Sequence, residues 1–164
     1  MYNHWDSYPS GLGLQLINQI KEAMRRGTFS QWPAKVGQLQ VVDLDGASPT
    51  QADITRLAPY TNLNVARQSV NDWYCLLRGT QGDLASVLEA GYVLHGDLDL
   101  SGEYTYVVNL DTDQFETYYD MDTCTSFPLD FLPGEEYFVG QWGVDEYHLK
   151  LQEHQSRMNS AASN

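Results

Sequence analysis

The residue types that most often carry chemistry are present in this 164-residue chain, but their spacing forms no recognisable site. Its four histidines are scattered along the chain, at His4, His95, His148 and His154. A structural zinc site needs Cys and His ligands at close, regular spacing. Cys75 lies in an apolar stretch, where cysteine behaves as a small hydrophobe, and Cys124 has no neighbouring histidine to act as its base. We therefore predict no metal, no cofactor and no catalytic residue, and the sequence favours a protein that is not an enzyme.

Pairs of aspartates separated by one residue are the remaining candidates for cation binding. They are Asp97 and Asp99, Asp111 and Asp113, and Asp120 and Asp122. Calcium takes about six to eight oxygen ligands, often from a loop with glycine at a fixed position. None of the pairs continues into the D-x-[DN]-x-[DN]-G pattern of an EF-hand. Each pair is more typical of a solvated turn than of a dedicated calcium site.

The charge of the chain is strongly acidic and unevenly distributed. Its 22 acidic residues exceed the 9 Lys and Arg residues, which gives a formal net charge of −13. Between Arg78 and Lys150 there is no Lys or Arg, and that interval holds fifteen acids. Such a field repels nucleic acid and anionic membranes and attracts basic protein surfaces. The alternative interpretation is that the acidic residues only keep the protein soluble.

The sequence also bears on location. No apolar run approaches the roughly 18 residues of a membrane-spanning helix, and the first residues lack the basic start and apolar core of a signal peptide. The two cysteines have no spacing typical of a disulfide framework. A reducing cytoplasm is therefore the expected location.

The most regular stretch, residues 102–121, predicts a β-hairpin. Aromatic and β-branched residues fill its first half, and they suit a pleated, half-buried surface. Side chains alternate across a strand, so one face of the first strand carries Tyr104, Tyr106, Val108 and Leu110. In the returning strand, Phe115, Thr117 and Tyr119 share one side, and Glu116, Tyr118 and Asp120 share the other. The turn is expected at 111–114, where aspartates bond their own backbone.

Helical patterns dominate the first half of the chain and strand patterns the second. Apolar spacing and capping residues predict helices near 11–26, 49–58, 72–77 and 84–90, with Ser10 and Ser48 as N-caps. Strands are expected at 38–44, 92–95 and 136–139, and the last two should extend the sheet of the hairpin. Residues 144–158 fit either a helix or a strand, and we favour a helix or a mixed segment. The order predicts an α+β fold, with N-terminal helices packed on a C-terminal antiparallel sheet. We expect one domain over 1–155 and a disordered tail at 156–164.

The most distinctive string is the N-terminal block from His4 to Gly13, with the sequence HWDSYPSGLG. Together with Tyr104–Asp111 (YTYVVNLD), it resembles a family of uncharacterised phage and bacterial proteins that carry a His-Trp-Asp-x-Tyr-Pro-x-Gly block ahead of an amphipathic helix. The resemblance covers about a third of the chain and implies a phage or mobile-element setting without a settled activity. The block itself has two interpretations. It is a ligand site built from His4, Trp5, Asp6 and Tyr8, or a turn whose Trp5 and Tyr8 belong to the core.

Three functions are consistent with these features. The first is a non-enzymatic binding protein whose acidic surface docks on a basic, nucleic-acid-binding protein and inhibits it by resembling nucleic acid, as anti-CRISPR and other anti-defence proteins do. The carboxylates that would contact this partner are Asp97, Asp99, Glu103, Asp111, Asp113, Glu116, Asp120 and Asp122. The second is an enzyme or small-ligand-binding protein that uses the block at 4–8. The third is a phage structural or accessory protein whose acidity serves only solubility.

Overall fold

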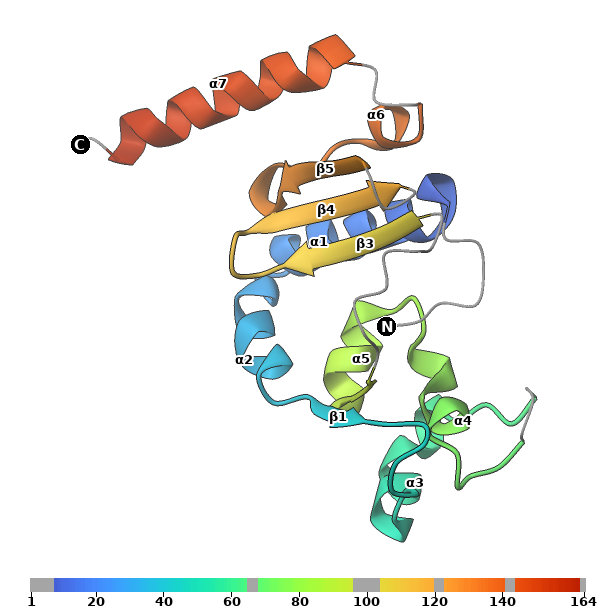
Figure 1. Cartoon of the computed structure of the whole chain (residues 1–164). Helices are drawn as coiled ribbons and strands as arrows, with labels where there is room; N and C mark the ends of the chain where they lie inside the picture. Colours follow the sequence, from blue (N-terminus) through green and yellow to red (C-terminus); the bar gives the residue numbers. More distant parts are fainter. Residues whose placement is uncertain (1–7, 65–67, 96–103, 120–122, 141–143, 163–164) are drawn as a thin grey trace. The chain divides into compact units, whose positions relative to one another are not determined.

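The structure, a computed structural model, describes residues 8–64, 68–95, 104–119, 123–140 and 144–162. Its contacts divide the chain into two compact units. Unit 1 comprises Met1–Asp6 and Asn18–Asp99, and unit 2 comprises Ser7–Ile17 and Leu100–Asn164. The predicted α+β fold is confirmed, because helices occupy most of the first half and a three-stranded antiparallel sheet lies in the second (Figure 1). No helix in the described ranges has the length and apolar character needed to cross a bilayer.

Unit 1 consists mainly of short helices around a small parallel sheet. Its helices are most of α1 (Leu14–Arg25), then α2 (Trp32–Val36), α3 (Gln51–Leu57), α4 (Trp73–Leu77) and α5 (Leu84–Ala90), with 3-10 turns at Phe29–Gln31, Ala58–Tyr60 and Arg78–Thr80. The strands β1 (Gln40–Val42) and β2 (Tyr92–Leu94) pair in parallel. The predicted helices at 72–77 and 84–90 are confirmed as α4 and α5. Asp72 and Asp83 cap their N-termini, and Gly91 ends α5 with a left-handed φ of 76°.

The start of α3 differs from the sequence prediction. Thr50, rather than Ser48, is the N-cap. Its hydroxyl accepts a hydrogen bond from the backbone N–H of Asp53 (3.3 Å), and the Asp53 carboxylate accepts one from the backbone N–H of Thr50 (2.8 Å). This reciprocal pair is a capping box, and it satisfies two N–H groups that the first helical turn leaves unpaired. The helix therefore begins at Gln51, two residues later than the predicted cap implied.

Asp53 also ties α3 to the parallel sheet. The Tyr92 hydroxyl donates a hydrogen bond to the other Asp53 oxygen (2.6 Å). The Tyr92 ring stacks on Trp73, with 5.6 Å between the centroids, and the Arg56 guanidinium lies 5.2 Å from the same ring. Hydrogen bonds from Tyr92 and then Thr50 hold the pKa of Asp53 below its ordinary value, and the same Asp53 bond raises the pKa of Tyr92. This contact anchors the core of unit 1, which includes Leu57 and Leu76.

Unit 2 is built around the sheet β3 (Tyr104–Asn109), β4 (Gln114–Tyr119) and β5 (Thr123–Pro128), with β4 in the middle (Figure 1). Before the sheet in sequence lies the π-helical turn Pro9–Gly13, and after it come a 3-10 turn (Leu129–Phe131), α6 (Glu135–Val139) and α7 (Val144–Ala162). Tyr8 rather than the predicted Ser10 is the N-cap of the helical start. The strand register places Tyr106, Thr117 and Thr125 side by side.

One face of this sheet is buried and forms the core of unit 2. Phe115 and Phe127 are opposite each other in register and are 0% and 1% exposed. Phe138 of α6 packs against both rings, with centroids 6.1 and 6.0 Å away. Gly13 approaches so closely that a Cβ there would lie 2.7 Å from the Phe138 ring. The predicted sharing of one face by Phe115 and Thr117 is therefore confirmed, because both are buried.

Three sequence predictions about this part of the chain are wrong. Residues 92–94 do not extend the antiparallel sheet, because they pair with β1 instead. Residues 135–139 form a helix rather than a strand, since Gly134 begins it and two glutamates occupy its first turn, where acidic side chains favour helix formation. The third strand is β5. The tail predicted to be disordered at 156–164 is helical through Ala162, as the end of α7.

Candidate protein-interaction surface

The face of the unit 2 sheet opposite the aromatic core is polar, and we call it the outer sheet face. The alternation and register place on it Thr105, Val107, Asn109, Gln114, Glu116, Tyr118, Cys124 and Ser126. Cys124 and Ser126 are exposed and the other six are half-buried. A sheet with one apolar and one polar face is typical of antiparallel architecture. In β4 and β5, the outer sheet face is therefore the more accessible side of the sheet.

A hydrogen-bonded network occupies the middle of the outer sheet face. Asn109 donates from Nδ2 to one oxygen of Glu116 (2.9 Å), and the Tyr118 hydroxyl donates to the other (2.7 Å). The Glu116 bond raises the pKa of Tyr118, and a bond with Cys124 adds to that increase. Glu116 was predicted to contact a partner, but both of its oxygens already accept bonds from the protein. In this position it orients Asn109 and Tyr118.

The hairpin turn holds two exposed carboxylates, whereas Glu116 in the adjoining strand is half-buried. Asp111 and Asp113 are both exposed. The Asn109 carbonyl oxygen, Oδ1, accepts hydrogen bonds from the backbone N–H groups of Asp111 (3.1 Å) and Thr112 (3.2 Å), and Asp113 takes a left-handed φ of 54°. The sequence predicts that aspartate side chains bond the backbone of the turn, but the Asn109 side chain accepts these hydrogen bonds instead. It fixes the turn and leaves the side chains of Asp111 and Asp113 in solvent.

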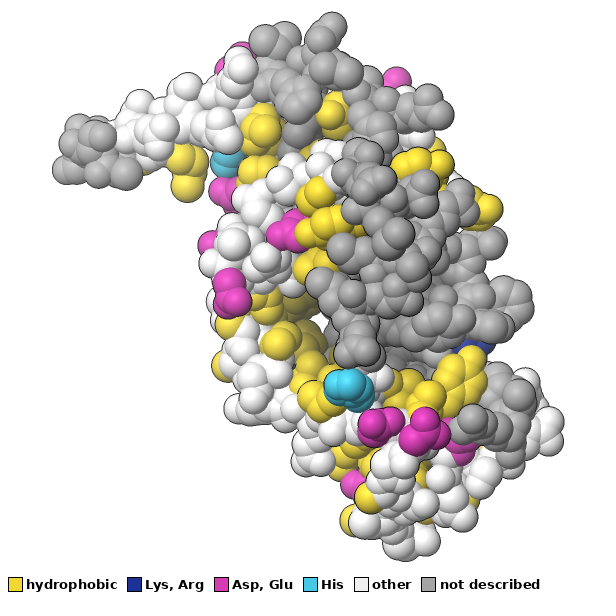
Figure 2. All heavy atoms as spheres, viewed as in Figure 1, with side chains coloured by type: hydrophobic (Ala, Val, Ile, Leu, Met, Phe, Trp, Pro, Cys, Tyr) yellow, Lys and Arg dark blue, Asp and Glu magenta, His cyan; other side chains and the backbone are white. Residues whose placement is uncertain are grey.

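The described acidic residues of unit 2 occur in several of its elements. Among the described residues of unit 2, exposed acids also occur in the 3-10 turn, α6 and α7: Asp130, Glu135, Glu136 and Glu153. In Figure 2, several described acidic side chains lie apart from one another on the face drawn, and others lie side by side. In unit 1, Arg25 and Arg26 form ion pairs with Glu22 of α1. Five of the predicted contact residues, Asp97, Asp99, Glu103, Asp120 and Asp122, lie outside the described residues.

The N-terminal block is only partly described. His4, Trp5 and Asp6 lie outside the described residues, so neither interpretation of the block is tested there. Tyr8 is 48% exposed, which does not match its predicted place in the core. Its carbonyl accepts the backbone N–H of Gly11 (2.9 Å), and its ring meets the edge of Tyr104 at 5.8 Å. Tyr8 therefore starts the helical turn and contacts the end of β3.

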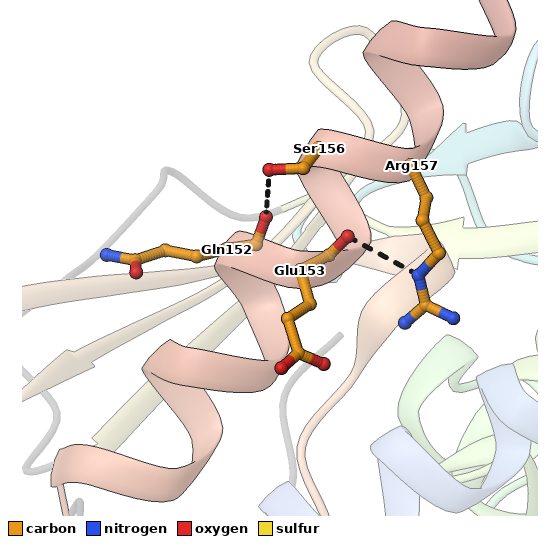
Figure 3. Close-up of a pocket in the computed structure, with 4 residues that line it drawn as sticks. All are labelled: Gln152, Glu153, Ser156 and Arg157. Atoms are coloured by element: carbon orange, nitrogen blue, oxygen red, sulfur yellow. Dashed lines mark hydrogen bonds between the residues drawn. The ribbon is translucent and has the colours of Figure 1, made fainter.

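Metal-binding side chains, the cysteines and a surface hollow are the remaining candidates for a site among the described residues. No three His, Cys, Asp or Glu side chains among them are grouped to hold a metal ion. Cys75 is fully buried in α4, as predicted for a structural cysteine. A hollow beside α7 is lined by Gln152, Glu153, Ser156 and Arg157 (Figure 3). Their drawn bonds are intrahelical, from Ser156 Oγ to the Gln152 carbonyl (2.9 Å) and from Arg157 Nε to the Glu153 carbonyl (3.4 Å). Side chains from a single helix surface do not converge on a ligand as a binding pocket requires.

Comparison with protein-family models, curated proteins and solved structures finds no match to this chain. The site therefore rests on the residues themselves. Sequence reasoning found the face that carries Glu116 and Tyr118, and it found the turn aspartates. It missed the Asn109–Glu116–Tyr118 network and the exposed Cys124. The two-residue spacing of Glu116 and Tyr118 in a strand indicates a shared face, but their contact with Asn109 depends on strand register, which the sequence did not supply.

Proposed function

We propose that this chain is a non-catalytic, acidic binding protein that docks on a basic protein surface through the turn and outer sheet face of unit 2. The observation that carries the proposal is the exposed pair Asp111 and Asp113, held by Asn109 in a fixed turn on a sheet without a basic residue. No Lys or Arg occurs anywhere from residue 79 to 149, so nearby side chains of that interval offer these carboxylates no permanent cation. A partner that supplies Lys or Arg would form ion pairs with the carboxylates of Asp111 and Asp113.

The partner class follows from the sign of the charge. A net charge of −13 opposes binding to nucleic acid and to anionic lipid, and it accelerates encounter with positively charged proteins. Large basic grooves occur mainly in proteins that bind nucleic acid. We therefore propose a nucleic-acid-handling protein as the partner, in the cytoplasm, with inhibition as the outcome because the acidic surface occupies the basic groove. The resemblance of the block at 4–13 to phage proteins supports an anti-defence setting.

A pair of matched charge reversals tests the proposal. Asp111→Lys with Asp113→Lys reverses the turn pair, and Glu116 stays unchanged because it supports the sheet. The control is Asp43→Lys with Asp45→Lys, which reverses an exposed pair of identical spacing in unit 1. Both variants have the same net charge, so a difference between them reports position. Folding of each is checked by its thermal unfolding curve.

The assay immobilises the full chain, exposes it to bacterial lysate at low and high salt, and identifies the captured proteins. We expect capture of a nucleic-acid-binding protein that added double-stranded DNA displaces. The turn variant should bind it at least about tenfold more weakly, since loss of about 1.4 kcal/mol is tenfold in affinity. The control should bind within about twofold of the unmodified chain. Equal capture by the two variants, or capture that DNA does not displace, would refute the proposal.

A further inference from the structure

The outer edge of β5 carries backbone groups that have no partner strand. In the described part of the chain, β5 pairs only with β4 and is an outermost strand of the sheet (Figure 1). Antiparallel strands direct the N–H and C=O groups of alternate residues toward one neighbour and those of the intervening residues toward the other. Which residues of β5 face outward therefore depends on the phase of its bonding to β4.

Two observations fix this phase. The backbone N–H of Leu129 donates to the Asp113 carbonyl at 2.9 Å, which makes the next pair in register, Gln114 and Pro128, a non-hydrogen-bonded pair. Pro128 has no N–H to donate, and proline in a strand is found where that position faces away from the sheet. Alternation then turns the backbone groups of Thr125 and Phe127 toward β4 and those of Cys124 and Ser126 toward the open edge.

Both outward-facing residues are accessible. Cys124 and Ser126 are exposed. Phe127, the next residue along β5, is only 1% exposed. An edge with free N–H and C=O groups at every second residue is a template for another extended segment. The strand contains none of the inward-pointing charges or lysines that proteins use to prevent such pairing, and proline occurs only at its end, Pro128.

Charge identifies the occupant. Asp130 lies exposed two residues beyond the end of β5, and Asp113 lies beside Leu129 at the same end of the sheet. A second copy of this chain would bring another −13 charges to the edge and be repelled, whereas a segment rich in Lys or Arg would be attracted. We infer that β5 accepts an extended, basic segment of the partner protein as a fourth strand, with main-chain bonds to Cys124 and Ser126. This inference rests on the proposed function and names how the partner binds.

The test uses a synthetic eight-residue peptide of alternating Lys and Val as the probe, added to the full chain labelled with nitrogen-15. We expect it to shift the amide signals of Cys124 and Ser126 more than those of β3. Two further peptides carry N-methyl groups on alternate residues, in opposite phases. Because only one phase of the peptide faces β5, one N-methylated peptide should bind at least about tenfold more weakly than the other. An alternating Glu and Val peptide should not bind.

Substitution of Ser126 provides the matching test in the protein. Ser126→Pro removes an N–H that does not bond to β4, and should reduce binding of the Lys and Val peptide about tenfold while the sheet stays folded. Ser126→Ala removes only the hydroxyl and should bind as the unmodified chain does. If the proline variant fails to fold, the N-methylated peptides still decide the result.

Three results would overturn the inference. Equal binding of the two N-methylated peptides would show attraction by charge alone, and would leave the proposed docking on a basic surface intact. Shifts confined to Asp111 and Asp113 would place the peptide on the turn, with the same consequence. Concentration-dependent dimerisation of the chain that Ser126→Pro abolishes would make a second copy the occupant. The proposed function fails separately, when the turn and control charge reversals capture the same proteins equally.

Discussion

Thr117 offers a direct measurement of what an unpaired polar group costs in the core of unit 2. Its side chain points into the aromatic face of the sheet and is 2% exposed. Its hydroxyl oxygen is buried and has no hydrogen-bond partner among the described residues. Burying a hydroxyl without a partner costs about 1–3 kcal/mol in proteins. Thr117→Val replaces the hydroxyl with a methyl group of similar shape, and should raise the free energy of unfolding by about 1–2 kcal/mol.

Two further substitutions separate the hydroxyl from other effects. Thr117→Ser keeps the hydroxyl and removes the methyl group, so it should lower the free energy of unfolding by about 1 kcal/mol. Thr125→Val makes the same chemical change directly across the ladder, at a half-buried position whose hydroxyl water can reach. We expect it to change stability by less than about 0.5 kcal/mol, which controls for the higher strand propensity of valine.

The assay combines urea unfolding with amide hydrogen exchange of β4 and β5, because exchange reports the stability of unit 2 itself. Thr117→Val should slow exchange of the β4 amides, and raise the melting temperature by about 2–4 °C per kcal/mol. If Thr117→Val were no more stable than the unmodified chain while Thr125→Val behaved as expected, the hydroxyl would have a partner such as a trapped water. The assignment of an unsatisfied group would then be refuted.

Three other perturbations test contacts of both units. Tyr92→Phe removes the 2.6 Å bond to Asp53 and should lower the free energy of unfolding by about 1–2 kcal/mol at neutral pH. The pKa of Asp53 in the folded protein is depressed below 3.8, so the stability that its charged form contributes is complete above that value and is lost as pH falls through the depressed pKa. Urea unfolding should therefore show the free energies of unfolding of the variant and the unmodified chain converging in acid. A difference that stays constant with pH would contradict this prediction. Gly91→Ala should cost about 1–2 kcal/mol in thermal unfolding, since φ is 76° there; an unchanged melting temperature would exclude that strain. His154→Ala removes the 3.0 Å contact with Asp130 and the 4.6 Å stacking on Phe131, and should speed amide exchange in α7 without changing exchange in β4. Equally faster exchange in α7 and β4 would show that His154 stabilises the sheet as well as α7.

The parts of the fold that depend on nearby residues could be predicted from the sequence. The apolar run at 72–77 predicts α4, and the spacing of Leu84, Val87 and Leu88 predicts α5, which ends where Gly91 follows it. The aspartates that cap both helices were not part of that prediction. The hairpin was recognised from its alternation. The parallel pairing of β1 and β2 was not predicted, because it joins residues about fifty positions apart and no local pattern specifies a parallel partner.

The remaining errors have a related cause. Tyr137, Phe138 and Val139 have the composition of a strand, but α6 forms because a short helix brings Phe138 onto the Phe115 and Phe127 rings. Tertiary packing overrides intrinsic propensity there. At the candidate site, the exposure of Asp111 and Asp113 followed from their place in a turn. The hydrogen bond between Glu116 and Asn109 could not be predicted, because only the strand register shows which residue of β3 lies near Glu116.

The chain order of the two units limits how the protein can be divided for further work. Unit 2 draws one piece from residues 7–17 and the other from residue 100 onward, so residues 18–99 of unit 1 lie between its two pieces in the sequence. A fragment that starts at residue 100 would lack Gly13 and leave the Phe138 and Tyr106 rings without the backbone that packs against them. Minimal versions of the sheet should therefore keep the piece around Gly13 together with the strands, rather than begin at residue 100.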